Sequence, residues 1–202
     1  MAAVIDIVNR ALTKLGERHI TSLGDDVKAA RAASSLYDIV RDAEIAAHSW
    51  NFAKKRDKLS AEAAKPEFGW SFQYLLPADC LRLLQLGSWP QPVMSDYVNG
   101  ENRQYVLEGG RILTNLGPTL NIIYLWRETE AGVYPPVFVE ALACKLAVEM
   151  AEILSGSGSK RQMAWEEYEQ AVKMARKINA ISQPPQMVQD DTWMLAHRMG
   201  VI

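Results

Sequence analysis

One short stretch decides the fold class of this chain: Trp70-Ser71-Phe72-Gln73-Tyr74-Leu75-Leu76-Pro77. Large apolar side chains occupy every second position from Trp70 to Leu76, which is the period of a strand with one buried face. Pro77 has no backbone N–H to give to a neighbouring strand, so the pattern ends there. The segments at either end of the chain follow a helical period instead. We therefore expect a sheet inserted between helices.

Further strand-like runs accompany this stretch. Residues 80–86 and 120–126 are short and apolar, and residues 105–107 and 112–114 flank Gly109-Gly110. Two glycines in succession suit a tight hairpin turn because both can take a positive φ. Residues 88–100 are rich in Pro, Ser, Asn and Gly and are expected to form a loop. Residues 52–127 are thus predicted to form a small, mainly antiparallel β-sheet.

Four helices are expected outside the sheet, at residues 2–15, 26–48, 135–154 and 160–181, where apolar residues recur at three- and four-residue steps. The signals at their ends are Gly16 as a C′ residue, Asp25 or Asp26 as an N-cap, Pro135-Pro136 in a first turn, a flexible Ser/Gly connection at 155–159, and Pro184-Pro185 as a stop. The prediction is an α+β fold, with a helical bundle of about four helices packed with the sheet in one domain over residues 1–185.

The second and fourth predicted helices each have an apolar and a polar face. The buried residues of the second are expected to be Ala30, Ala33, Tyr37, Val40, Ala43 and Ala47, and those of the fourth Ala164, Tyr168, Ala171, Ala175 and Ile178. Charges of both signs fill the opposite face of the second helix, namely Lys28, Arg31, Asp38, Arg41 and Asp42. That face is interpreted as solvated or as a subunit contact.

The composition narrows the class of protein. The chain has 202 residues, of which 49% are hydrophobic and 23% charged, with a formal net charge of −2. These values are typical of a folded domain, and the absence of a basic excess speaks against a protein that grips nucleic acid. We expect neither an export signal nor a membrane span, and we expect Cys80 and Cys144 to be reduced and buried.

A search for catalytic or metal-binding patterns finds none that outweighs a structural explanation. His19, His48 and His197 have no metal-ligand spacing, and His48 is better explained as a capping or packing residue. The Ser/Gly run at 155–159 lacks the lysine of a phosphate loop. Lys54-Lys55-Arg56 could contact phosphates, although a solvated strand edge explains it better. No catalytic residue, metal site or cofactor is therefore predicted.

Four segments, taken in order, resemble the tail tubular protein A family of short-tailed phages and prophages. They are Ala11–Glu17 with Ile20–Leu23 and Asp25-Asp26; Tyr37–Glu44 with His48–Ala53 and Arg56; Phe68–Trp70 with Tyr74 and Leu76–Arg82; and Tyr134–Phe138 with Glu140–Ala143. Each segment alone is weak evidence for this family. The ordered set spans residues 3–180 and is fairly specific. The segments 88–103 and 186–202 carry the least resemblance.

The resemblance implies a structural virion protein, made in the host cytoplasm, that forms a ring beneath the portal as a head-to-tail adaptor. The expected ring is a dodecamer that binds the portal protein on one side and the downstream tail nozzle or tube protein on the other. Genomic DNA would pass through it during ejection without specific binding. A neutral or acidic channel wall would let the genome slide.

Two groups of residues are assigned to contacts in this hypothesis. Complementary charges on the second and fourth helices would join neighbouring subunits through Arg31, Asp38, Arg41, Glu166, Glu169 and Lys173. The last segment, 186–202, is predicted to be a docking tail, because it holds three large apolar residues in succession yet is too short to form a core of its own. Its expected docking residues are Trp193, Met194, Leu195 and Arg198.

Three alternatives stay open at this point, one of them another type of connector and two from other classes. A tail-associated peptidoglycan hydrolase would need two carboxylates facing each other across a cleft. Another alternative is a small adaptor of long-tailed phages. Such adaptors are mostly helical, so the strand-like pattern in the centre of this chain speaks against it. A regulatory nucleic-acid-binding module would show salt-dependent DNA affinity.

Overall fold

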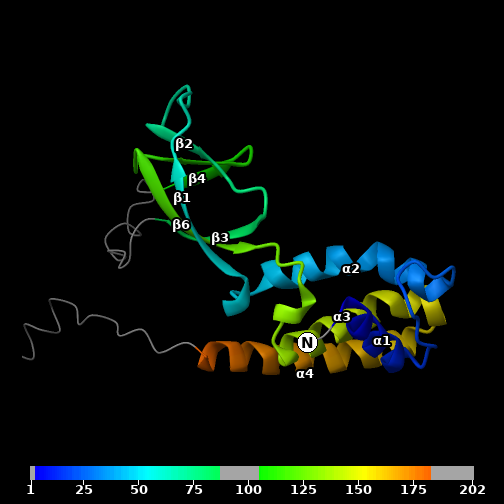
Figure 1. Ribbon diagram of the computed structural model, residues 1–202. Coiled ribbons are helices and arrows are strands. Elements are labelled where there is room, and N and C mark those ends of the chain that lie inside the picture. The colour runs from blue at the N-terminus through cyan, green and yellow to red at the C-terminus, as the bar shows by residue number, and fades with distance from the viewer. Residues whose placement is uncertain (1–2, 87–104, 183–202) are drawn as a thin grey trace, which may run out of the picture.

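A computed structural model describes residues 3–86 and 105–182, which form an α+β fold of a helical layer and two small sheets (Figure 1). The helices are α1 (Val4–Leu15), α2 (Lys28–Ala47), α3 (Pro136–Ser155) and α4 (Gly158–Ile181), with short 3-10 helices η1 (Asn51–Ala53) and η2 (Ala131–Val133). The strands are β1 (Lys54–Ser60), β2 (Phe72–Leu75), β3 (Cys80–Leu86), β4 (Tyr105–Glu108), β5 (Arg111–Thr114) and β6 (Thr119–Trp126). The predicted fold class is confirmed.

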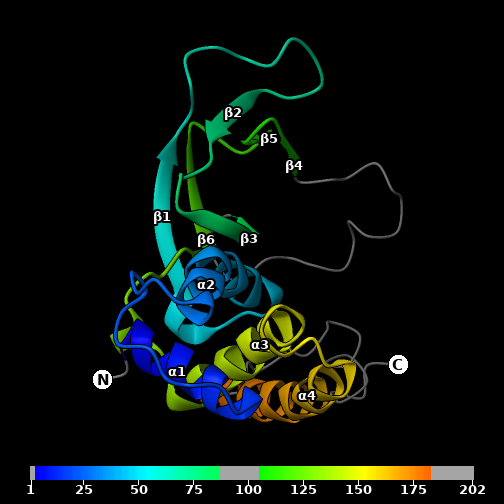
Figure 2. The ribbon, with the colours of Figure 1, turned by 90° about the vertical axis from the view of Figure 1, so that its right-hand side faces the viewer.

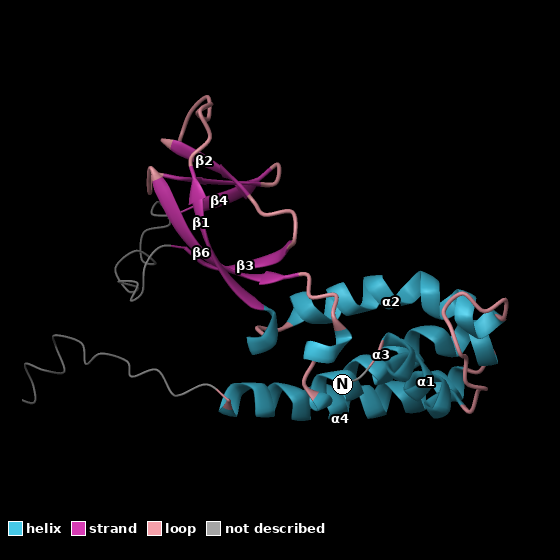
Figure 3. Cartoon of the chain, in the orientation of Figure 1, coloured by secondary structure: helices cyan, strands magenta, loops and turns pink. Residues whose placement is uncertain are grey.

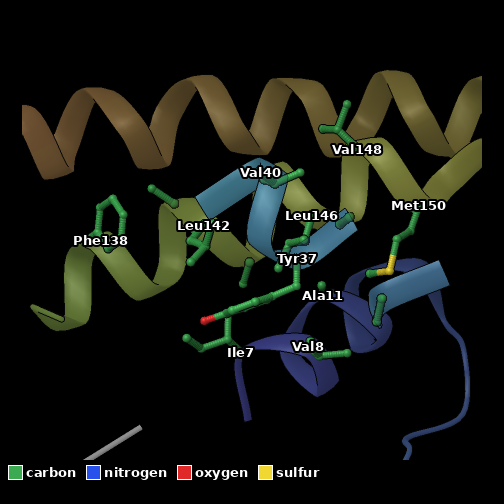
Figure 4. Close-up of a cluster of buried hydrophobic side chains, with 14 of the residues drawn as sticks. Ile7, Val8, Ala11, Tyr37, Val40, Phe138, Leu142, Leu146, Val148 and Met150 are labelled. Carbon is green, nitrogen blue, oxygen red and sulfur yellow. The ribbon is translucent and has the colours of Figure 1, made fainter. Parts of the chain in front are cut away.

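Helix α3 is the centre of the helical layer. It lies between α2 and α4 in Figure 2, and α1 also packs against it. Ten of its residues are buried, from Phe138 to Ala151, so it is covered by neighbours on most of its circumference. Small side chains such as Ala143 and Ala147, both fully buried, allow the close approach of these neighbours. Figure 4 shows Leu142 and Leu146 of α3 in the same cluster as Ile7 of α1 and Tyr37 of α2.

Several local end signals act as the sequence predicts. Gly16 follows α1 with φ 71°, and the backbone N–H of Glu17 donates to the carbonyl of Leu12 at 2.9 Å. Pro136 is the first residue of α3, where its missing N–H has no helical partner. Gly109 and Gly110 both have positive φ in the turn that joins β4 to β5. The predicted hairpin is therefore confirmed.

The start of α2 is a correction. Neither Asp25 nor Asp26 caps this helix, which begins at Lys28 with Val27 as its N-cap. The Asp25 carboxylate instead accepts hydrogen bonds from the backbone N–H groups of Thr21 and Ser22, at 2.9 and 3.0 Å. These bonds lower the pKa of Asp25 and hold the turn before the helix. The connection expected at 155–159 is also shorter than predicted, because only Gly156 and Ser157 separate α3 from α4.

The sheet region is two three-stranded antiparallel sheets, and not one. Their strand orders are β1-β6-β3 and β2-β5-β4. Tyr74, Ile112, Ile122 and Tyr124 fill the core between the two sheets. Both sheets stand to one side of the helical layer in Figure 3, and β6 joins the two parts because its Leu125 is buried in the helical core. Cys144 is buried as expected, whereas Cys80 on β3 is partly exposed; both are free thiols.

Candidate functional site

The outer side of α4 carries a row of exposed apolar side chains. Met163, Met174 and Ile181 are 64%, 55% and 73% exposed, and Ile178 is 40% exposed beside them. Steps of eleven and seven residues return to the same side of an α-helix, so these side chains form one row along it. We call Met163, Met174, Ile178 and Ile181 the α4 stripe. The prediction that Ile178 belongs to the buried face was wrong.

The side of α4 that faces the core is firmly attached, and at 100° per residue the stripe lies about a third of a turn round the helix from it. Ala164, Val172 and Ala175 are buried in the helical core. Near the C-terminal end, the backbone N–H and the side-chain amide of Asn51 donate to the two oxygens of Asn179, each at 2.9 Å. At the other end, the Lys160 ammonium donates to the carbonyl of Leu15 at 2.7 Å. The α4 stripe is therefore the free face of a helix held at both ends.

The three predicted contact residues on α4 are exposed. Glu166 follows Met163 by three residues, and Lys173 directly precedes Met174, so both lie along one margin of the α4 stripe, with Glu169 further round the helix. An apolar row with a charged margin is the usual composition of a protein-binding surface. The sequence offered a signal for this row, because Met163 and Met174 share one side of the predicted helix.

Of the three predicted contact residues on α2, two are exposed and one is buried. Arg31 is exposed and pairs with Asp26 at 2.5 Å, and Asp38 is also exposed. Arg41 is only 5% exposed, so its assignment to a solvated face was wrong. Its guanidinium donates to Asp38 and to Asp42, each at 2.7 Å. Burial disfavours the charge, but these two carboxylates more than compensate and raise the pKa of Arg41.

Arg41 lies in a shallow pocket of about 610 Å³ where the helical layer meets the end of β6. Apart from Arg41, it is lined by Val4, Leu23, Tyr37, Asp38, Asp42, Arg127 and Thr129. Arg127 donates to the second oxygen of Asp42 at 2.6 Å, so both acids of the pocket already pair with arginine. Burial raises the pKa of Tyr37 to about 12, which keeps its hydroxyl protonated. The pocket thus joins the two layers and offers no free base.

A second charged cluster attaches α1 to α3 and α4. The Glu140 carboxylate pairs with Arg10 and Lys14, and Lys14 also pairs with Glu167 at 2.9 Å. Although burial opposes it, hydrogen bonding from Arg10 and Lys14 lowers the pKa of Glu140. Cys144 lies beside this cluster, and burial raises the pKa of its thiol. A protonated, buried thiol is a poor nucleophile.

Histidine and metal chemistry have little support in the described residues. His19 shares a hydrogen bond with Thr13 at 2.8 Å, and His48 packs edge-on against Trp50 with ring centroids 4.8 Å apart. The packing role predicted for His48 is confirmed. Across residues 3–86 and 105–182, no group of three or more His, Cys, Asp or Glu side chains could hold a metal ion. The same ranges contain no helix long and apolar enough to cross a bilayer.

Glu44 is a buried acid that the periodicity of α2 did not predict. It is 5% exposed, and the Tyr168 hydroxyl donates to it at 2.8 Å. Ala43 and Ala47, which were expected to be buried, are exposed instead, because the second half of α2 turns Arg41, Glu44 and Ile45 inward. Burial raises the pKa of Glu44, and the Tyr168 bond and the charges of Lys145 and Arg176 only partly oppose this.

Replacing Glu44 with glutamine should therefore change how stability depends on pH. A raised pKa in the folded state means that ionisation of Glu44 disfavours folding, and this cost develops as pH rises from the unfolded pKa through the folded pKa. Glutamine keeps an acceptor for Tyr168 but does not ionise. The melting temperature of Glu44→Gln relative to the wild type should increase between about pH 4 and about pH 7. Thermal unfolding at both pH values measures this, with the exposed Glu169→Gln as control; a relative decrease for Glu44→Gln would contradict the prediction.

The predicted docking residues Trp193, Met194, Leu195 and Arg198 lie outside the described residues, as do His197, Pro184-Pro185 and the predicted loop at 88–100. A comparison with protein-family models and with curated proteins gives no match for this chain.

Proposed function

We propose that this chain is a structural subunit of a virion ring, the head-to-tail adaptor that joins the portal to the tail of a phage or prophage particle. The observation that carries the proposal is the α4 stripe, a row of large apolar side chains exposed on a rigid helix. A solitary protein gains nothing from such a row, whereas contact with a second copy removes it from water. The ordered sequence resemblance to tail tubular protein A supplies the class of particle.

The positions of the contact residues suit a ring. A cyclic ring requires that one face of a subunit meet a different face of the next. Helices α2 and α4 lie on different sides of α3 (Figure 2), so exposed charges of α2 and the α4 stripe belong to different faces. Arg31 and Asp38 on α2 could then meet Glu166, Glu169 and Lys173 of the neighbour. Arg41 has a different role, because it is buried and pairs within its own subunit.

The helical layer and the sheets would contact different partners in the adaptor. The helical layer would make the ring contacts, with a dodecamer as the expected assembly. The sheets stand away from it (Figure 3) and would present their loops to the downstream tail nozzle or tube protein. Residues 186–202, with Trp193–Leu195 and Arg198, would dock on the portal or a neighbouring subunit. Genomic DNA would pass through the ring without its sequence being read.

Mixing the full chain with portal-bearing heads tests this function. Electron microscopy should reveal an added ring beneath the portal, because the portal offers a circular template for the subunits. A chain lacking residues 186–202 should fail to complete tails, since its docking segment is missing. A full chain that stays solitary beside the portal at every concentration would refute the adaptor function, and completion of tails by the shortened chain would refute the docking role.

The same preparation tests the hydrolase alternative. Among the described acids, burial raises the pKa of Glu44, which is the direction that a general acid needs, but its carboxylate is buried against Tyr168. The adaptor should leave the turbidity of a peptidoglycan suspension unchanged. If the wild-type chain clears the suspension and Glu44→Gln does not, the adaptor function is refuted in favour of a hydrolase.

A further inference from the structure

Three basic residues lie on one face of β1. Lys54, Arg56 and Lys58 alternate with Lys55, Asp57 and Leu59, so the two sets point to opposite faces of the strand. The register with β6 pairs Lys55 with Tyr124, which is buried between the sheets, and pairs Lys54 with Leu125, which is buried against the helices. Lys54, Arg56 and Lys58 therefore belong to the face that turns away from the core between the sheets, which we call the outer face; its Lys54 end borders the helical layer. The basic triplet noted in the sequence is divided between two faces.

Two further cations extend this outer face. Strand β6 lies between β1 and β3, and its Leu125 pairs with Lys54 of β1 and with Arg82 of β3. Paired residues of neighbouring strands point to the same face, so Arg82 and Lys54 share a face. Arg176 comes from the C-terminal half of α4, which the Asn51–Asn179 hydrogen bonds hold beside the start of β1. After burial, the charges of Arg176, Arg82 and Lys54 lower the pKa of His48, which lies among them. We call Lys54, Arg56, Lys58, Arg82 and Arg176 the basic face.

Four of the five cations of the basic face form no ion pair in the described part of the chain, although the charge of Arg176 also acts on the buried carboxyl of Glu44. Lys54 donates to the amide oxygen of Asn51 at 3.1 Å, and no ion pair there includes Arg56, Lys58, Arg82 or Arg176. Lys55, on the opposite face, pairs with Asp79 at 2.7 Å. Lys55 thus has an acidic partner among the described residues, whereas these four cations of the basic face have none in an ion pair. The basic face is therefore a local positive surface on a protein whose formal net charge is −2.

The shape and composition of this surface favour a phosphate backbone over a protein. Alternate residues of a strand lie about 6.6 Å apart, which gives Lys54, Arg56 and Lys58 a regular row of positive groups. Protein interfaces need an apolar centre. None of the large exposed apolar residues of the described chain lies on β1 or β3, the two strands that carry four of the five cations of the basic face. Backbone binding to nucleic acid depends on charge and needs no apolar anchor.

We propose that the basic face binds the phosphate backbone of double-stranded DNA without reading its sequence. The proposal goes beyond the adaptor function and does not depend on ring formation, because all five cations belong to one subunit. In a ring the same contact would be repeated in every subunit and would guide the passing genome. This differs from the neutral or acidic wall expected from the sequence.

The test uses the full chain and a short fluorescein-labelled DNA duplex, with binding followed by fluorescence polarisation from about 50 to about 200 mM NaCl. Each phosphate contact contributes a slope of about −0.9 to the dependence of log affinity on log salt, so four contacts predict a loss of about 100-fold over this range. The variant Arg56→Gln with Lys58→Gln removes two exposed charges. It should lower affinity about 10-fold or more at the lowest salt and reduce the slope by about 2.

The matched control is Arg18→Gln with Lys28→Gln, which removes one arginine and one lysine that are also exposed and form no ion pair in the described chain. This control should bind as the wild type does. Equal losses in both double variants, or no binding at the lowest salt, would overturn the proposal. Tighter binding of poly-glutamate than of the duplex would also overturn it and assign the basic face to an acidic protein segment. None of these results would bear on ring formation, which is measured separately on portal-bearing heads.

Discussion

Replacing Phe138 with alanine is expected to lower the free energy of unfolding by about 3–5 kcal/mol, the usual cost of removing a buried phenylalanine. Phe138 is 1% exposed. Its ring centroid lies 5.0 Å from Trp50, 4.8 Å from Phe52 and 5.3 Å from Tyr134. These neighbours come from the segments that lead into β1 and out of β6, so the cluster joins the sheets to the helical layer. A void at Phe138, near the start of α3 in Figure 4, would loosen that junction.

The polar ends of the cluster make relaxation around the void costly. The indole N–H of Trp50 donates to the carbonyl of Glu44 at 2.8 Å, and the Tyr134 hydroxyl donates to the carbonyl of Glu128 at 2.7 Å. Neither ring can move into the vacated space without losing a buried hydrogen bond. The site should therefore collapse poorly, which favours the upper part of the expected range.

Urea unfolding followed by far-UV circular dichroism measures the effect. The control is Phe68→Ala, the same change at a residue that is 88% exposed, which should alter stability by no more than about 0.5 kcal/mol. A loss of less than about 1 kcal/mol for Phe138→Ala would mean that the aromatic cluster does not hold the two layers together.

Replacing Met174 with glutamate is expected to prevent ring assembly without unfolding the subunit. Met174 is 55% exposed at the middle of the α4 stripe, so the free subunit tolerates a charge there. In a contact with the next copy, the new carboxylate would be buried without a partner, at a cost of about 3 kcal/mol or more. That corresponds to about a 100-fold weaker contact. Every contact of the ring would be affected.

Crosslinking and electron microscopy on portal-bearing heads measure this assembly, and far-UV circular dichroism checks the fold. Phe68→Glu is the matched control, because it places the same charge on an exposed apolar residue of the sheet region, away from the helical layer. The control should still form rings. Normal rings with Met174→Glu would show that subunits meet through another surface and would remove the main support for the proposed function.

Local sequence determined where the elements lie and what kind they are. The alternation around Tyr74, the glycine pair at 109 and 110, and Pro136 at the start of α3 all act on the backbone within a few residues of themselves. Steric limits on φ and the period of a strand or helix need no distant partner. The α+β fold class and the approximate bounds of the four helices could therefore be predicted.

Partners far apart in sequence decided the rest. A period of two predicts a strand but does not name its neighbour, and β2 pairs with β5 while β3 pairs with β6, which gives two sheets where one was expected. A helical period likewise predicts an apolar face without saying how many neighbours surround the helix. Arg41 is buried because Val4, Leu23 and the chain after β6 enclose it, and Glu44 because Tyr168 of α4 reaches it. The α4 stripe is exposed for the complementary reason: α3 packs against another side of α4, and no described element covers the stripe.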